Sequence, residues 1–185
     1  LDPIGNMIVD IGGGTTEIAV IALGGMVSRK SVRVAGDEFD TSIIQYMRKA
    51  YNLQIGEQTA ERVKIQIGSF APLEQELSLE VAGRDVVTSM PRRVVLTSEE
   101  VREALTGPLS EILNAIRECL ESTPPELAAD LIERGITMCG GNSLVKGIAE
   151  AVGKAVAVPV RIADEPLTCV ARGTGLVIEN LDRFK

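Results

Sequence analysis

The chain has 185 residues, of which 45% are apolar and 24% charged, a composition typical of a globular domain or of a domain with a smaller inserted lobe. It contains no histidine, which excludes Ser-His-Asp or Cys-His catalysis and any His-ligated zinc or haem. Its formal net charge of −7, without a basic cluster, argues against nucleic acid as a partner.

The cysteines and the ends of the chain indicate a cytosolic fragment. Cys119, Cys139 and Cys169 are widely spaced and contain no Cys-x-x-Cys pair. The sequence therefore predicts neither a disulfide framework nor a metal knuckle, and it favours a reducing cytosol. No apolar run approaches the roughly 18 residues that span a bilayer. The start at Leu1, without Met or a signal-peptide pattern, is interpreted as a cut inside a longer protein.

The amino-terminal part predicts three strands followed by a helix. Residues 7–10, 15–22 and 26–34 are apolar or β-branched and are separated by glycine-rich turns, which is typical of an antiparallel meander. Asp37 then has the side chain of a helix cap. We expect the following helix to pack on the sheet, because apolar residues recur in it at helical spacing. These residues are Phe39, Ile43, Ile44, Met47 and Ala50.

Residues 51–96 differ in character from the segment that precedes them. A short helical pattern over residues 59–67 is followed by alternating strand patterns over 77–81 and 93–96, with a glycine and a proline between them. We interpret this part as a small inserted subdomain.

A long amphipathic helix is predicted next. Thr97 and Glu100 have the spacing of a capping box. Pro108 lacks an amide hydrogen and clashes with the preceding turn, so it predicts a kink or a break. A second helix begins with proline in its first turn after Thr123 and ends at Gly135. The apolar stripe of the long helix consists of Val101, Leu105, Leu109, Ile112, Ile116 and Leu120.

The carboxyl-terminal part alternates strands and helices. We expect a strand over residues 136–139, a helix from about Ser143, a strand over 160–163 and a final helix after Pro166. This alternation implies parallel pairing with right-handed crossovers. The predicted fold class is therefore an α/β lobe, with a mixed sheet and helices on both of its faces, plus a small inserted α+β subdomain.

The stretch after the first strand carries the strongest chemical signal. Three consecutive glycines between two strands let backbone amides turn inward without obstruction by Cβ atoms, which suits them to phosphate oxygens. Two threonine hydroxyls add donors, and an aspartate at the strand end is placed to hold the waters of Mg²⁺. A glycine-rich hairpin with an incidental acid is the alternative. The residues are Asp10, Gly12, Gly13, Gly14, Thr15 and Thr16.

Three further segments are candidate ligand contacts. One follows an apolar strand and opens a helix, where amide donors and a positive helix end coincide. In another, an acid and a lysine three residues apart share a helix face, from which they can reach a ribose and a base. The ordinary alternatives are a strand-to-helix loop, an exposed ion pair and, for the third segment, helix capping. The residues are Gly140, Gly141, Asn142 and Ser143, then Glu61 and Lys64, and lastly Asp37.

The order of these motifs resembles one protein superfamily. The succession is Asp-x-Gly-Gly-Gly-Thr, Ala-Gly-Asp-Glu-Phe-Asp, Gly-Glu-x-x-Ala-Glu-x-x-Lys and Gly-Gly-Asn-Ser. It is similar to the second half of the actin, Hsp70 and sugar-kinase ATPases and, within them, to the MreB family of bacterial actins. The stretches Thr-Pro-Pro-Glu-Leu, Ile-Glu-Arg-Gly and Glu-Pro-Leu-Thr-Cys-Val-Ala-Arg-Gly extend the resemblance over nearly the whole chain.

This resemblance implies a ribonuclease H-like lobe that binds ATP and Mg²⁺. Residues 1–50 and 97–185 would form the large subdomain and residues 51–96 the small one. The resemblance assigns Asp10 to Mg²⁺ through water, the hairpin to the second phosphate loop and the Gly-Gly-Asn-Ser segment to adenosine. The nucleotide-binding residues it implies are Gly12, Gly13, Gly14, Thr15, Thr16, Asp37, Glu61, Arg62, Val63, Lys64, Gly140, Gly141, Asn142 and Ser143.

The resemblance also implies a function and partners. Members of this family hydrolyse ATP slowly as they polymerise, and their cytoplasmic, membrane-associated filaments determine rod shape and guide cell-wall synthesis. The expected partners are further copies, the cytoplasmic membrane and the cell-wall elongation machinery. The family's first phosphate loop and catalytic glutamate lie in an amino-terminal half, so we expect this chain alone to be inactive as an ATPase. An Hsp70-like or sugar-kinase lobe and a plasmid-segregation filament are the alternatives.

Overall fold

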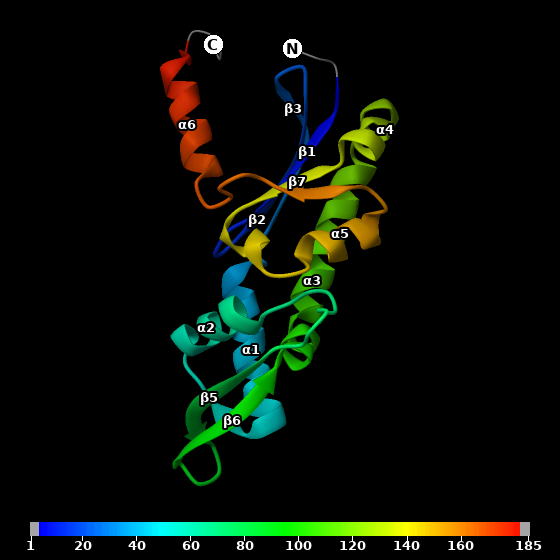
Figure 1. Cartoon of the computed structure of the whole chain (residues 1–185). Coiled ribbons are helices and arrows are strands. Elements are labelled where there is room, and N and C mark those ends of the chain that lie inside the picture. Colours follow the sequence, from blue (N-terminus) through cyan, green and yellow to red (C-terminus); the bar gives the residue numbers. More distant parts are fainter. Residues whose placement is uncertain (1–3, 182–185) are drawn as a thin grey trace.

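The computed structural model describes residues 4–181, which form an elongated molecule with a sheet in each half (Figure 1). The larger sheet has five strands in the order β3-β2-β1-β7-β8. Its first three strands form the predicted antiparallel meander, and β7 and β8 extend it in parallel from β1. The strands are β1 (Asn6–Ile11), β2 (Thr16–Ala22), β3 (Gly25–Val32), β7 (Ile136–Cys139) and β8 (Val160–Ile162).

The smaller sheet is antiparallel, with the order β4-β5-β6. Helix α1 packs chiefly against α2, β4 and the long helix α3 (Ser98–Glu121), so most of its contacts with other helices and strands lie in this half of the molecule. The division of the chain at residues 50 and 97 stays a prediction, and its outer limits at 1 and 185 lie outside the described residues. The elements are β4 (Leu53–Gln54), β5 (Ser78–Asp85), β6 (Pro91–Thr97), α1 (Gly36–Tyr51) and α2 (Glu57–Ile67).

One face of the larger sheet is buried. Met7 and Val9 of β1 and Met138 of β7 are inaccessible to solvent, whereas their neighbours Ile8 and Thr137 are only half-buried. This alternation follows from the two-residue period of a strand, which sends successive side chains to opposite faces. The buried face packs against α3 (Ser98–Glu121), α4 (Pro125–Arg134) and α5 (Ile148–Val156).

Helix α3 connects the two halves of the molecule. It begins with the predicted capping box, because Thr97 accepts a hydrogen bond from the Glu100 amide and the Glu100 carboxylate accepts one from the Thr97 amide. The break predicted at Pro108 is wrong: the helix continues through this residue for 24 residues in all. Leu105 and Ile112 are fully buried on either side of the proline, and this packing holds the two turns together across the missing hydrogen bond.

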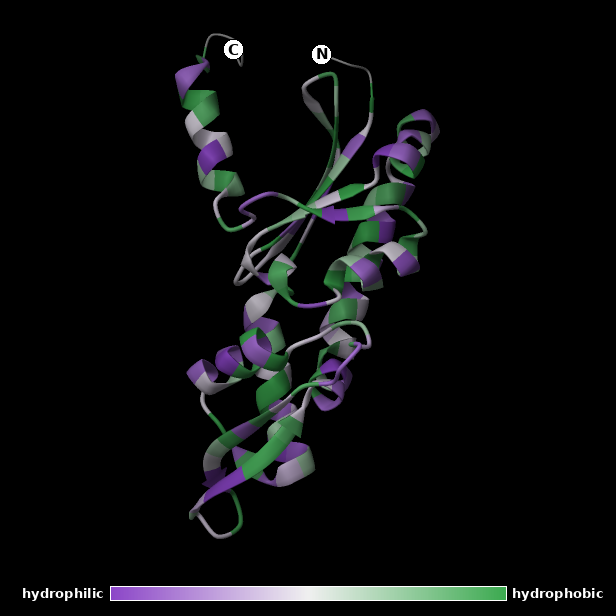
Figure 2. Ribbon diagram, in the orientation of Figure 1, coloured by the Kyte–Doolittle hydropathy of each residue, from purple (hydrophilic) through white to green (hydrophobic). Residues whose placement is uncertain are grey.

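Helix α6 (Cys169–Glu179) stands apart from the sheet and buries none of its residues (Figure 1). Apolar side chains along it, such as Val170 and Ile178, are exposed, and Figure 2 shows green segments along the helix that alternate with white and purple ones. The expectation of helices on both faces is therefore met on one face only: α3, α4 and α5 cover it, and α6 does not pack on the other. Between residues 4 and 181, no helix has both the length and the apolar character needed to cross a membrane.

Candidate functional site

The turn between β1 and β2 exposes a row of backbone donors. The Gly12 amide donates to the Thr15 carbonyl across the turn, with an N to O distance of 3.0 Å. Gly13, Gly14 and Thr15 are exposed, and in the described part of the chain their amides donate to no protein acceptor. Successive free amides of this kind form a concave anion-binding surface. The turn thus has free donors, and its binding of a phosphate stays a prediction.

Thr16 lies beneath the turn and not at its rim. Its side chain is fully buried, and its hydroxyl donates to the Val34 carbonyl at 2.7 Å. The predicted role of this hydroxyl as a ligand donor is therefore wrong, because the group is already engaged inside the protein. Thr16 ties the start of β2 to the segment before α1, while Thr15 keeps an exposed position in the turn.

The start of α1 is held against the same turn. The Gly36 amide donates to the Gly12 carbonyl at 3.2 Å, and the Asp37 amide donates to the Gly13 carbonyl at 2.8 Å. The helix has no side-chain cap, so the predicted capping role of Asp37 is wrong. Its carboxylate lies in the first turn of the helix, where the dipole favours negative charge. A Cβ atom at Gly13 or Gly14 would lie 3.8 or 3.5 Å from a carboxylate oxygen of Asp37.

The second glycine segment follows β7 and requires glycine at its first position. Gly140 has φ +83, and a Cβ atom there would lie 2.3 Å from the Ile11 carbonyl oxygen and 2.4 Å from Oδ1 of Asp10. The helix expected from Ser143 does not form; a short 3₁₀ helix (Gly141–Leu144) stands there, and α5 begins four residues after it. The buried Ser143 hydroxyl donates to the Gly140 carbonyl at 2.7 Å. This hydrogen bond links the two ends of the Gly-Gly-Asn-Ser segment.

Asn142 joins the two glycine segments. Its Nδ2 donates to the Gly12 carbonyl oxygen at 2.7 Å, although the two residues are 130 positions apart. The fit is close, because a Cβ atom at Gly36 would lie 2.3 Å from the same nitrogen. The β1–β2 turn, the start of α1 and the segment after β7 therefore meet at one place.

A pocket of about 320 Å³ opens beside this junction, between α2 and the segment after β7. This volume and its mixture of apolar walls with a few polar groups are typical of small-molecule sites. Glu61 on α2 and Asn142 on the opposite side supply polar groups. The complete lining consists of Glu61, Lys64, Ile65, Gly141, Asn142, Leu144, Val145 and Leu167.

Lys64 lines the pocket with its charge engaged inside the protein. Its side chain is only 7% exposed, and Nζ lies 3.0 Å from Asp40 and 3.4 Å from the Gly36 carbonyl oxygen. Burial raises the pKa of Asp40, while the hydrogen bond from Lys64 acts in the opposite direction. In this structure the ammonium group therefore contacts Asp40 and the Gly36 carbonyl in place of the base that we expected it to contact. Lys64 instead fixes α2 to the start of α1.

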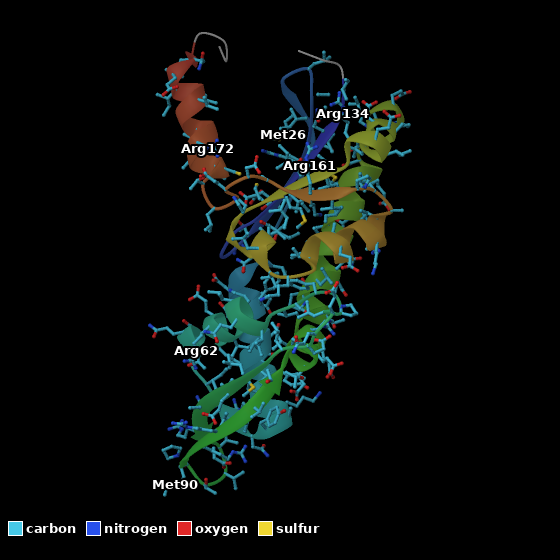
Figure 3. All side chains as sticks on the ribbon, viewed as in Figure 1. Met26, Arg62, Met90, Arg134, Arg161 and Arg172 are labelled. Atoms are coloured by element: carbon cyan, nitrogen blue, oxygen red, sulfur yellow. The ribbon has the colours of Figure 1, made fainter. Side chains whose placement is uncertain are left out.

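Two other residues of α2 do not reach the pocket as expected. Val63 is fully buried in the core. Arg62 is exposed, and Figure 3 shows it on the outer side of α2. Neither residue lines the pocket, because successive helix positions point about 100° apart and α2 turns Glu61, Lys64 and Ile65 toward it. The predicted nucleoside contacts of Arg62 and Val63 stay a prediction.

Asp10 lies one residue before the end of β1, beside a cysteine that sequence reasoning did not assign to the site. Asp10 and Cys139 are register partners on the parallel strands β1 and β7. Burial raises the pKa of Asp10, and a hydrogen bond with Cys139 lowers it. Burial also raises the pKa of Cys139 to about 12, with smaller contributions from Asp10 and Cys169. The only sequence signal was that both residues lie at the carboxyl end of a strand, within two positions of a glycine.

The arrangement suits a ligand with two chemically different ends. Exposed amides at the β1–β2 turn attract an anionic group, and the adjoining pocket offers apolar walls to a flat or aromatic group. The carboxylates of Asp10 and Asp37 flank the anion-binding turn. Together with the mixed sheet, these features define one lobe of an actin-like protein.

Solved structures and a family model agree with this class. The structure of MreB 5 of Spiroplasma citri bound to AMPPNP superposes with a TM-score of 0.95 at 41% identity, covering 98% of this chain and 55% of that chain. A MamK double helical filament superposes with a TM-score of 0.73 at 27% identity, covering 88% and 50%. The model of the MreB/Mbl protein family matches residues 1–185, and the chain belongs to that family.

A curated relative is similar over almost the whole chain. The cell shape-determining protein Mbl of Bacillus cereus is 48% identical over 182 residues, which are 98% of this chain and 55% of the relative. The chain therefore spans about half the length of this relative. Membership of the MreB/Mbl family replaces the alternatives of an Hsp70-like or a sugar-kinase lobe.

Proposed function

We propose that this chain forms one lobe of a cell shape-determining bacterial actin, that the lobe binds ATP with Mg²⁺, and that the whole protein polymerises into filaments. The hydrogen bond from Asn142 to Gly12 carries the proposal, because it joins the anion-binding turn to the wall of the apolar pocket. A nucleotide has a phosphate tail for the first and an aromatic base for the second. The relative bound to AMPPNP supports this ligand class.

The phosphate tail binds at the β1–β2 turn. The amides of Gly13, Gly14 and Thr15 are exposed and have no protein acceptor among the described residues. Hydrogen bonds from amides to an anionic oxygen are shorter and stronger than those between neutral groups. The turn carbonyls of Gly12 and Gly13 already accept hydrogen bonds, so the turn offers its donors outward.

The nucleoside occupies the pocket between α2 and the 3₁₀ helix. Ile65, Leu144 and Leu167 form apolar walls for the base. Glu61 is exposed on the pocket face of α2, where its carboxylate accepts hydrogen bonds from ribose hydroxyls. Lys64 contributes by holding α2 against α1 through Asp40.

The residues beside the turn fit Mg²⁺. Asp10 and Asp37 supply only oxygen donors, the ligands that this hard cation prefers, and Mg²⁺ usually keeps several waters with one or two carboxylates. The Asp10 carboxylate lies against Gly140, where a Cβ atom would be 2.4 Å from Oδ1. In this proposal it would hold the ion through water. When bound, the ion neutralises phosphate charge. ATP turnover needs the family's first phosphate loop and glutamate, so we expect nucleotide binding without hydrolysis from this chain alone.

Isothermal titration of the chain with ATP and Mg²⁺ tests the nucleotide site. Loss of one hydrogen bond is worth about 0.5–1.5 kcal/mol, so Asn142→Ala should weaken binding by about 2- to 12-fold. Gly13→Val should abolish binding, since its side chain enters the turn beside Asp37. Gly107→Ala, on α3 with nothing within 4 Å of the new Cβ, is the control and should bind normally. Unchanged affinity in both site variants would contradict the assignment.

Filament formation is supported by exposed apolar residues at the two ends of the molecule. Val87 and Met90 are 77% and 65% exposed at the tip of the β5–β6 hairpin. At the other end Leu23, Met26 and Ile132 are 59%, 60% and 67% exposed. Figure 3 shows Met90 at one end of the molecule and Met26 with Arg134 toward the other. Contact between unlike ends is heterologous and generates an open polymer when it does not close.

Charge near the two ends is complementary. The hairpin strands carry Arg84 and Arg92, of which Arg92 is paired with Asp85, whereas the exposed surface of α4 carries Glu126 and Glu133 beside one arginine, Arg134. Opposite charges steer two surfaces together and disfavour contact between like ends. The MamK filament supports self-association in an actin-like protein of similar fold. We propose that such filaments act at the cytoplasmic membrane with the cell-wall elongation machinery.

Sedimentation of the whole protein with ATP and Mg²⁺ tests the filament. Val87→Asp and Ile132→Asp each place a charge in an apolar end and should leave the protein in the supernatant. Thr106→Asp adds the same charge to an exposed position in the middle of α3 and should pellet normally. The head-to-tail arrangement is rejected if both end variants pellet as the unmodified protein does.

A further inference from the structure

The two walls of the proposed nucleoside pocket belong to different parts of the chain. Glu61, Lys64 and Ile65 lie on α2, whereas Leu144 and Val145 lie on the segment after β7. Helix α2 packs against α1 and β5, in the half of the molecule that contains the smaller sheet. The width of the pocket therefore depends on the contacts that hold α2 at a fixed distance from the segment after β7.

The two walls are joined at one end by the segment that follows α2. Residues 68–76, here called the strap, leave α2, cross α3 and continue toward β5 (Figure 1). Ser69 in the strap forms a parallel bridge with Lys146, and the Phe70 amide donates to the Lys146 carbonyl at 2.8 Å. Lys146 comes directly after the pocket wall, and its Nζ donates to the Gln66 carbonyl of α2 at 3.1 Å. The strap thus closes one end of the pocket.

The strap fits closely where it meets the segment after β7. Gly147 has φ +74, and a Cβ atom there would lie 2.7 Å from both the amide nitrogen and the Cβ atom of Ala71. Phe70 is buried, and its ring packs edge to face on that of Phe39 of α1, with 5.3 Å between the two ring centroids. The strap is therefore anchored in the core at this point.

Arg102 of α3 holds the strap from the other side. Its side chain is 21% exposed, and its Nε and Nη2 donate to the Ser69 hydroxyl oxygen at 3.1 and 2.9 Å. Nη2 also donates to a carboxylate oxygen of Glu76, at the far end of the strap, at 2.8 Å. Ser69 is fully buried, and its own hydroxyl donates to the Ala71 carbonyl at 2.9 Å. One planar guanidinium group thus binds both ends of the strap.

Glu76 is in turn fixed by the start of α3. Its carboxylate accepts hydrogen bonds from the Ser98 hydroxyl and from the Leu73 amide, the latter at 3.2 Å. The Ser98 hydroxyl oxygen accepts one from the Leu77 amide at 2.8 Å. Neither Arg102 nor Glu76 lines the pocket. An effect of Arg102 on the pocket must therefore pass through the strap.

We propose that Arg102 is a positioning residue for the nucleoside, because through Ser69 and the strap it sets the distance between α2 and the segment after β7. This inference rests on the nucleotide site proposed above. The phosphate turn is held separately, since the hydrogen bonds to its carbonyls come from the start of α1 and from Asn142. Loss of the guanidinium group should therefore weaken binding at the nucleoside end and leave the phosphate end unchanged.

Titration of the chain with three ligands tests this division. Adenosine probes the nucleoside end, tripolyphosphate with Mg²⁺ probes the phosphate end, and ATP with Mg²⁺ probes both. Arg102→Met should weaken the binding of adenosine and ATP by about 2- to 30-fold, the range of couplings carried through intermediate residues, with tripolyphosphate binding unchanged. Arg102→Lys keeps the charge without the planar fork, so its affinities should be intermediate. Arg117→Met, on the exposed surface of the same helix, is the matched control and should bind all three ligands normally.

A double-mutant cycle shows whether Arg102 acts through Ser69. Ser69→Ala removes the hydroxyl group that accepts from the guanidinium group. Arg102→Met should therefore change adenosine affinity less in the Ser69→Ala chain than in the unmodified chain. If the two losses simply add, Arg102 acts by another route and the proposal is overturned. Far-ultraviolet circular dichroism checks the fold of each variant, and Arg102→Lys carries the test if Arg102→Met does not fold.

Amide hydrogen exchange tests the strap without a ligand. In Arg102→Met the Phe70 amide and those of residues 141–147 should exchange faster than in the unmodified chain, with the exchange of β1 to β3 unchanged. If the unmodified chain binds no adenosine, the nucleotide proposal fails, and the role of Arg102 is then decided by exchange alone. The role of Arg102 is rejected if the Phe70 amide exchanges at the unmodified rate, or if tripolyphosphate binding falls as far as adenosine binding.

Discussion

Replacing Gly140 by alanine is expected to destabilise the chain strongly. Gly140 has φ +83 and ψ 159, a region that costs a residue with a Cβ atom about 1–3 kcal/mol. The new Cβ would also lie 2.3 Å from the Ile11 carbonyl oxygen, which belongs to a buried central strand and cannot move away. Overpacking of this kind costs about 1–3 kcal/mol. The expected loss is therefore about 2–6 kcal/mol, a large part of the roughly 5–15 kcal/mol that stabilises a typical domain.

Urea unfolding followed by circular dichroism measures this loss as a lower midpoint at unchanged slope. Gly107→Ala is the matched control, because it replaces a glycine inside α3 where nothing lies within 4 Å of the new Cβ. That variant should gain about 0.5–1 kcal/mol, since alanine has the better helix propensity. If Gly140→Ala unfolded at the same urea concentration as the unmodified chain, the close approach of β1 to this turn would be refuted.

Three more predictions concern parts of the molecule away from this turn. Thr97→Ala removes the capping box of α3 and should lower the free energy of unfolding by about 1 kcal/mol in the same assay. Lys64→Met leaves Asp40 buried without its partner and should cost about 3–5 kcal/mol, whereas adding Asp40→Leu should recover part of that loss in a double-mutant cycle. Backbone amides of the following turn lower the pKa of Asp85, and a hydroxyl and a guanidinium lower that of Glu76. Both folded-state pKa values lie below the unfolded ones, so the contribution of these two carboxylates to the free energy of unfolding is complete above about pH 5. It declines as the pH falls through the folded-state pKa values. The free energy of unfolding of Asp85→Asn should therefore depend less on pH in the acid range.

Features encoded by neighbouring residues were predictable from the sequence. The β-branched runs between glycine turns predicted the meander of β1 to β3, and the spacing of Thr97 and Glu100 predicted the start of α3. The break predicted at Pro108 failed because it was a local argument. Buried packing of Leu105 and Ile112 on either side holds the helix together, and tertiary contacts of this kind override propensity.

The positions of the glycine turns at the site were predictable from the sequence, whereas the contacts of its side chains were not. Runs of glycine identified both turns, because a close approach of backbones leaves no room for a Cβ atom, as Gly140 shows. The internal hydrogen bonds of Thr16 and Lys64 could not be foreseen, because their partners, the Val34 carbonyl and Asp40, lie far from them along the chain. Cys139 was missed for a related reason: its position beside Asp10 depends on the pairing of β7 with β1, which no local pattern records.

The anion preference proposed for the β1–β2 turn follows from the different positions of its hydrogen-bond acceptors and donors. Its carbonyls at Gly12 and Gly13 accept hydrogen bonds from Gly36, Asp37 and Asn142, which belong to two other elements. Since the acceptors are engaged internally, the exposed surface of the turn is dominated by N–H groups, and an anion meets little repulsion from carbonyl oxygens. A change at the start of α1 or at Asn142 is therefore expected to act on anion binding through the carbonyl groups of the turn. The segment after β7 and the turn after β1 therefore depend on each other for their conformation, because the hydrogen bond from Asn142 to the Gly12 carbonyl joins them.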